Sequence, residues 1–141
     1  MPDDPEALPA SRLACTVVGI ALAFLGIGLF ADWAWLVARW PWPLPSLPAR
    51  VVGAWLCTYA AVLLWFALRE RSWVRARIGV VSAGIALGLD VGAAVRYSSD
   101  LDGDASTVVY LAGTSTLLVL LLGIWCLEEW RLSAPRSRGY R

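Results

Sequence analysis

Residues 77–96 read RIGVVSAGIALGLDVGAAVR, an apolar run of helix length bounded by an arginine at each end. Its one charged side chain between those arginines is Asp90, which lies near the middle of the run. A carboxylate at the centre of a membrane-spanning helix costs about 2.5–3.5 kcal/mol on insertion scales. The segment therefore predicts a transmembrane helix, and it marks Asp90 as a functional or helix-packing residue.

Three further segments have the length and apolarity that a membrane span requires. A bilayer core about 30 Å thick needs about 20 apolar residues per helix. With 59% hydrophobic and 16% charged residues, the 141-residue chain is too apolar for an ordinary soluble domain. We predict an all-α, polytopic membrane protein, a four-helix transmembrane bundle with spans at Leu13–Ala31, Val51–Leu68, Ile78–Val95 and Thr107–Leu127.

The spans divide the chain into one membrane domain, residues 12–130, and two short tails. Residues 1–11 contain prolines and acidic residues and predict a disordered cytoplasmic tail, and residues 131–141 predict a basic cytoplasmic tail. A cleaved signal peptide is the alternative for the first span. It is disfavoured because the preceding residues are acidic and because the apolar run exceeds the usual 7–15 residues.

The arginines give the expected orientation. All 12 basic residues are arginine, and three of them, Arg39, Arg50 and Arg96, fall on the side opposite the termini. The other nine flank the first and fourth spans or lie between the second and third. By the positive-inside rule we expect a multi-pass protein of the cell (inner or plasma) membrane with both termini in the cytoplasm.

The outer loop between the first two spans is rich in tryptophan and proline. We expect its prolines to prevent a continuous helix and its indole rings to lie in the lipid headgroup layer as interfacial anchors. The alternative is a lid or docking surface for a lipid, a quinone or a partner helix. The tryptophans concerned are Trp33, Trp35, Trp40 and Trp42.

Residues 40–55, WPWPLPSLPARVVGAW, carry a family resemblance. The run resembles the WPWxLxxLxARxxGAW-like signature of uncharacterised four-helix integral membrane proteins from high-GC, actinobacterial-type bacteria. The resemblance implies the architecture and no activity. It also implies that Arg50, Gly53 and Trp55 form a unit, in which Gly53 lets another backbone approach.

The third span also carries a stripe of glycines. Gly84, Gly88 and Gly92 recur every four residues, as in helix-packing motifs, and Asp90 falls about 160° away around the helix. Small residues line that second face as well. We therefore expect this helix to be surrounded by protein, either within the bundle or across an oligomer interface.

Matching depth in the membrane suggests partners for Asp90. Thr58 and Tyr59 of the second span lie at a similar depth, as do Thr114, Ser115 and Thr116 of the fourth. Alternatively, Arg50 or Arg96 reaches down from the outer end to form an ion pair. The intramembrane polar site predicted from these alternatives consists of Asp90, Tyr59, Thr58, Thr114, Thr116 and Arg50.

Residue types and motifs that are missing from the sequence disfavour several classes of function. It has no histidine, no nucleophile–base pair, no metal-ligand cluster and no phosphate loop, so no catalytic residue, metal site or cofactor is predicted. The expected partners are the lipid bilayer and other membrane helices, without nucleic acid. The leading hypothesis is an accessory, structural or assembly subunit that packs with itself or with a larger complex. The alternatives are a small oligomeric proton- or cation-coupled transporter or channel using Asp90, and a lipid or quinone binder under the tryptophan loop.

Overall fold

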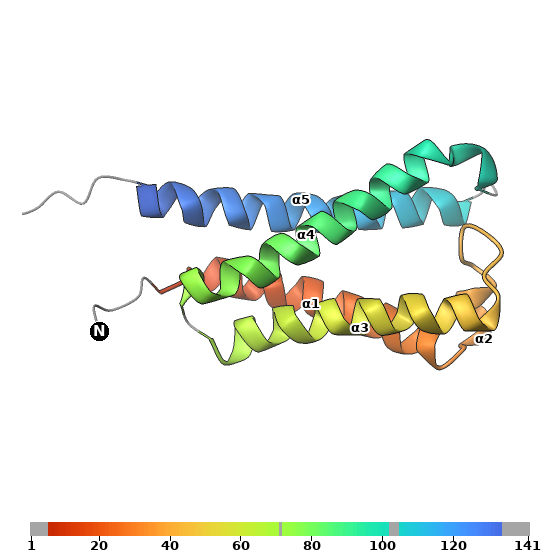
Figure 1. Cartoon of the computed structure of the whole chain (residues 1–141), viewed down its shortest axis with the longest axis horizontal. Helices are drawn as coiled ribbons and strands as arrows, with labels where there is room; N and C mark the ends of the chain where they lie inside the picture. The colour runs from red at the N-terminus through yellow and green to blue at the C-terminus, as the bar shows by residue number, and fades with distance from the viewer. Residues whose placement is uncertain (1–5, 71, 102–104, 134–141) are drawn as a thin grey trace, which may run out of the picture.

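The computed structural model describes residues 6–70, 72–101 and 105–133 (Figure 1). Within them, four helices are long and apolar enough to cross a membrane, which confirms the predicted all-α four-helix membrane bundle. The elements in chain order are α1 (Pro9–Phe30), α2 (Ala34–Val37), α3 (Ser46–Leu68), α4 (Trp73–Arg96), a 3₁₀ turn (Ser98–Asp100) and α5 (Ala105–Ser133).

The long helices run roughly along one axis, with α1 and α3 side by side and α4 crossing obliquely in front of α5 (Figure 1). α1 begins and α5 ends at the same end of the bundle, which we call the terminal end. The opposite, or loop, end carries α2 and the turn that leads into α5. This arrangement has the up-and-down connectivity expected of four successive spans.

A contact between helix backbones joins α1 to α3 through two glycines. A Cβ atom on Gly53 would lie 2.6 Å from both the carbonyl oxygen of Gly26 and the backbone nitrogen of Phe30. A Cβ on Gly26 would lie 2.8 Å from the carbonyl oxygen of Gly53. The two backbones therefore touch, which is the close approach expected of Gly53 and the usual device of helix association in lipid.

α4 and α5 each bury a seam with alternating spacings of three and four residues. On α4 the seam consists of Trp73, Ala76, Val80, Ala83, Leu87 and Ala94, and half-buried Asp90 occupies the vacant position in the same series. On α5 it consists of Thr107, Thr114, Leu121, Ile124 and Glu128, with partly buried Tyr110 and Leu117 completing it. This spacing keeps one face of each helix toward its neighbours, as in coiled-coil packing.

The helices extend beyond the apolar segments because backbone hydrogen bonding within a helix does not require apolar side chains. α3 begins at Ser46, five residues before the predicted span, and accommodates Pro48 in its first turn. A proline there loses no helical hydrogen bond, since the first N–H groups of a helix have no partner within it. α5 likewise continues to Ser133, past the predicted end at Leu127.

The N-terminal region differs from the expected tail in its described part. Residues 1–5 lie outside the described residues, but Glu6 forms an isolated antiparallel bridge with Ser72, and α1 begins at Pro9. Ala7 is buried against the main core. The segment from residue 6 to residue 11 is thus ordered because it packs against the α3–α4 connection, a long-range contact that composition does not reveal. Of the predicted basic tail, residues 134–141 lie outside the described part.

Candidate functional site

Asp90 faces α5, where its partner is Tyr110. The Tyr110 hydroxyl donates a hydrogen bond of 2.5 Å to Oδ2 of Asp90, and both side chains are half-buried at seam positions of their helices. Thr114, one turn further along α5, is buried at the next position of the same seam. No described arginine forms an ion pair with Asp90. The hydrogen bond therefore joins α4 to α5 at a depth where water is scarce, and each partner satisfies the other.

Tyr110 also connects Asp90 to the tryptophan-rich loop. Its ring centroid lies 5.3 Å from that of Trp40 and 5.4 Å from that of Trp42, and both pairs have edge-to-face geometry. Trp40 and Trp42 contact each other at 5.5 Å in the same manner. Aromatic pairs of this geometry contribute about 0.5–1.5 kcal/mol beyond burial of their area. The loop is thus fixed onto α5 directly above the Asp90–Tyr110 hydrogen bond.

Trp40 is buried with its indole N–H unpaired. The side chain is 8% exposed, and no described residue accepts a hydrogen bond from Nε1. A buried donor without a partner is unfavourable, so this N–H is a position where an acceptor-bearing ligand would gain a hydrogen bond. It supports the lipid- or quinone-binding alternative more than any feature of the other tryptophans does.

The remaining two loop tryptophans pack against α1. Trp33 and Trp35 are stacked with ring centroids 6.2 Å apart, and Trp33 meets Phe24 edge-on at 5.6 Å. A Cβ on Gly28 would lie 2.7 Å from Cε3 of Trp33, so this glycine provides the space that the indole occupies. The four tryptophans therefore form two pairs, of which Trp33 and Trp35 lie on α1 while Trp40 and Trp42 lie on Tyr110.

Among the described residues, none of the other predicted partners forms a hydrogen bond or ion pair with Asp90. Thr58 and Tyr59 line a shallow hollow of about 240 Å³ on α3, together with Trp55. The hydroxyl of Thr58 donates to the carbonyl oxygen of Ala54 at 2.9 Å, and that of Thr116 donates to Ala112 at 2.7 Å, both within their own helices. Arg50 is exposed near the start of α3. Arg96 lies 5.6 Å from the ring centroid of Tyr97.

The predicted helix-packing glycines have open surroundings within one chain. A Cβ on Gly84, Gly88 or Gly92 would meet no atom within 4 Å. The chain's own close contacts instead use Gly19, Gly26, Gly28, Gly53 and Gly79. The α4 stripe is consequently free to receive a helix from outside the bundle.

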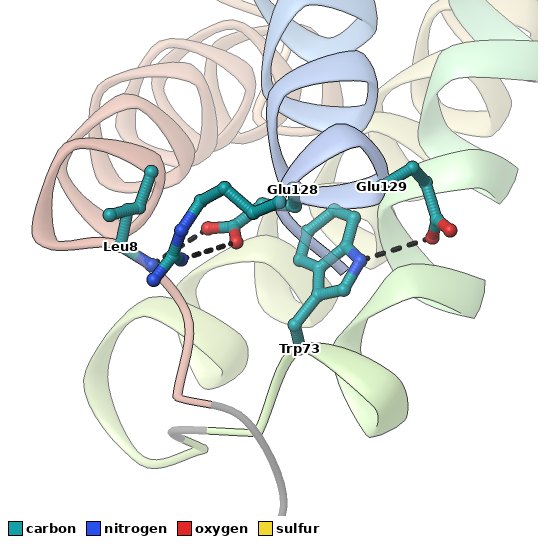
Figure 2. A network of polar contacts seen from close by, with 5 residues as sticks. Leu8, Trp73, Glu128 and Glu129 are labelled. Atoms are coloured by element: carbon teal, nitrogen blue, oxygen red, sulfur yellow. Dashed lines mark hydrogen bonds and ion pairs between the residues drawn. The ribbon is translucent and has the colours of Figure 1, made fainter. Parts of the chain in front are cut away.

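A polar network at the terminal end was not anticipated from the sequence (Figure 2). Glu128 is buried, with 1% of its surface exposed. Its carboxylate accepts a 2.7 Å hydrogen bond from the backbone N–H of Leu8 and a 3.0 Å hydrogen bond from Nη1 of Arg131. The neighbouring Glu129 accepts a 3.2 Å hydrogen bond from the indole N–H of Trp73. A buried carboxylate at the start of α1 also interacts favourably with the positive end of the helix dipole. The network therefore joins α1, α4 and α5.

Arg12 of α1 hydrogen-bonds to the remaining helix, α3, at the terminal end of the bundle. Its Nε and Nη2 atoms donate to the carbonyl oxygen of Ala67, at 3.0 and 2.7 Å. Ala67 lies in the last turn of α3, where carbonyl groups lack helical partners. An arginine counted only for topology in the sequence thus caps a neighbouring helix.

We expect Tyr110→Phe to destabilise the bundle by about 1 kcal/mol, because interhelical hydrogen bonds in membranes contribute about 0.6–2 kcal/mol. Unfolding in mixed detergent micelles, followed by circular dichroism, measures the change. Tyr97→Phe is the matched control, since Tyr97 is exposed and its hydroxyl has no recorded partner among the described residues. Equal stability of the two variants would contradict a stabilising role for the Asp90–Tyr110 hydrogen bond.

No protein-family model, curated protein or solved structure matches the chain. The functional assignment therefore depends on the geometry of the chain itself.

Proposed function

We propose that this small integral membrane protein is an assembly subunit, which binds other membrane helices through the glycine stripe of α4. The partner is a second copy of the chain or a helix of a larger membrane complex. The observation that carries the proposal is the open space beside Gly84, Gly88 and Gly92.

The contact between α1 and α3 illustrates how glycines allow two helices to pack closely. Gly26 and Gly53 bring α1 and α3 into backbone contact, whereas the equivalent surface of α4 meets nothing. In the most apolar stretches of α4 and α5, 22% of the residues are buried, against 39% in α1, so both helices present surface to their surroundings. Lipid chains are as apolar as leucine, so helices associate in a bilayer through close packing more than through the hydrophobic effect. A stripe that permits this packing and has no internal partner favours an external one.

The setting of Asp90 favours assembly over transport. Its carboxyl group is engaged by Tyr110 across the α4–α5 seam, beneath Trp40 and Trp42. This hydrogen bond holds α4 in place from the side opposite the stripe. We interpret Asp90 as a residue that fixes the orientation of α4, so that the stripe faces outward.

We further propose that the protein lies in the cell membrane, and the distribution of arginines supports an orientation with the terminal end in the cytoplasm. Arg12, Arg69, Arg75, Arg77 and Arg131 all belong to that end among the described residues. Short loops and tails rich in arginine are retained on the cytoplasmic side.

We expect Gly88→Leu to weaken assembly by about tenfold or more, because overpacking costs about 1–3 kcal/mol and 1.4 kcal/mol corresponds to a factor of ten. Native mass spectrometry of the gently solubilised protein measures the loss. Gly123→Leu is the matched control, since Gly123 is an exposed glycine of α5 with equally open surroundings. A wild-type protein that is monomeric and free of protein partners, or equal losses in both variants, would contradict the proposal.

A further inference from the structure

A groove lies between α4 and α5 toward the terminal end, about two helical turns from Asp90 and about one turn from Gly84, the nearest glycine of the stripe. Its volume is about 400 Å³, and it opens on the outer surface of the bundle. Six residues line it: Arg77, Ile78, Val81, Ser82, Trp125 and Glu129. The groove thus has two charged side chains of opposite sign and three large apolar ones.

The ion pair between Arg77 and Glu129 in the groove is long. Nη1 of Arg77 lies 3.8 Å from Oε1 of Glu129, beyond ordinary hydrogen-bonding distance. The same Oε1 accepts the indole N–H of Trp73, while Oε2 of Glu129 has no recorded partner in the described part of the chain. Arg77 is 52% exposed and Glu129 is 31% exposed. Both groups therefore retain hydrogen-bonding capacity toward a bound molecule.

The apolar side chains extend the groove toward the membrane interior. Ile78, Val81 and Trp125 are exposed on the outer surface of the bundle, where hydrocarbon rather than water surrounds a spanning helix. Arginine and tryptophan are both favoured at headgroup depth. The combination matches a molecule with a charged head and an acyl chain, namely a membrane lipid.

We propose that this groove binds a phospholipid of the phosphatidylethanolamine class. The lipid phosphate accepts hydrogen bonds from Arg77, and the primary ammonium group donates to Glu129. One acyl chain lies along Ile78 and Val81 beside the ring of Trp125. The charges in the groove match this headgroup in both sign and number.

Other common headgroups match the pair less well. Phosphatidylglycerol places a negative phosphate beside Glu129 and offers it no cation. Phosphatidylcholine carries a quaternary ammonium, which has no N–H to donate to the carboxylate. The groove should therefore prefer the primary ammonium lipid over both.

Native mass spectrometry tests this preference, with the full-length protein exchanged into detergent containing equimolar phosphatidylethanolamine, phosphatidylcholine and phosphatidylglycerol. We expect phosphatidylethanolamine to be the dominant adduct. Glu129→Gln should reduce its preference over phosphatidylcholine by about tenfold, because a hydrogen bond between charged groups supplies an effect of that size. Arg77→Gln should reduce binding of all three lipids. Arg75→Gln, two residues away on the same helix and outside the groove, should leave the adducts unchanged.

A fourth variant tests the groove without changing its charges. Ser82→Leu fills the groove and should lower phosphatidylethanolamine occupancy while leaving the melting temperature within a few degrees of wild type. Phosphatidylglycerol as the preferred adduct, no lipid preference at all, or unchanged adducts in both Glu129→Gln and Ser82→Leu would each overturn the proposal. The lipid proposal is read from the identity of the adducts and the assembly proposal from oligomer size in Gly88→Leu, so the failure of one is distinguishable from the failure of the other.

Discussion

Gly53→Val should destabilise the bundle by about 3 kcal/mol or more, the largest effect that we expect from a single substitution. The new Cβ atom would lie 2.6 Å from the Gly26 carbonyl oxygen and from the Phe30 nitrogen. Both are backbone atoms, so no side-chain rotation relieves the clash, and α1 and α3 must separate. Because these two helices form the most extensive contact of the bundle, their separation disturbs the core they share.

Gly113→Val in α5 provides the matched control for this prediction. It makes the same chemical change in a helix interior, but its Cβ meets no atom within 4 Å. Thermal unfolding in detergent, followed by circular dichroism, should give a greatly lowered midpoint for Gly53→Val and a small shift for Gly113→Val. Similar shifts for both variants would show that α1 and α3 are not in backbone contact.

Glu128→Ala should destabilise the protein by about 3 kcal/mol, because it removes two charge-assisted hydrogen bonds from an almost fully buried position. The backbone N–H of Leu8 loses its acceptor, and Arg131 loses its partner (Figure 2). The favourable interaction of a carboxylate with the N-terminus of α1 also disappears. We expect the first turn of α1 to fray and α5 to loosen at the terminal end.

Glu129→Ala is the control for Glu128, since the two carboxylates are adjacent and differ in burial. Glu129 is 31% exposed, and within the described residues its carboxylate accepts one hydrogen bond, from Trp73, and lies 3.8 Å from Arg77, so its removal should cost less than half as much. Hydrogen exchange of the Leu8 amide, together with the unfolding midpoint, distinguishes the two variants. If both variants lowered stability equally, Glu128 would have no special role in anchoring α1.

The four helices follow from the sequence because hydropathy and length dictate them directly. A bilayer admits few alternatives for a segment of about 20 apolar residues, so element type and order are predictable. The residues at which the helices begin and end are less predictable. The start of α3 at Ser46 and the end of α5 at Ser133 depend on hydrogen bonding that continues past the apolar run.

The partner of Asp90 had a detectable signal in the sequence. Counting back from Glu128 in alternating steps of four and three gives Ile124, Leu121, Leu117, Thr114, Tyr110 and Thr107, which is the buried seam of α5. Matching residues by depth in the membrane identified Thr114 but not Tyr110. Depth matching selects residues near the centre of a span, whereas the seam follows one face of the whole helix. A longer side chain on the seam reaches further along the membrane normal than a threonine does.

The roles of individual glycines could not be separated from sequence alone. Gly84, Gly88 and Gly92 have the regular spacing of a packing motif, yet they meet nothing within the chain. Gly26 of α1 and Gly53 of α3 bring two backbones into contact, although residues in different helices form no spacing motif. Which glycine meets which depends on the relative placement of helices, a tertiary property. The burial of Glu128 is hidden for the same reason, since the N-terminal segment provides one of its hydrogen-bonding partners.

The most direct test of assembly through α4 is photo-crosslinking in intact membranes. A benzophenone amino acid replaces Ile85, an exposed residue beside Gly84, or Val119, an exposed residue of α5 that serves as the reference position. The account predicts that Ile85 yields a crosslink to a second polypeptide, and that adding Gly88→Leu abolishes it, whereas Val119 yields lipid adducts. Lipid adducts alone at both positions would contradict the account.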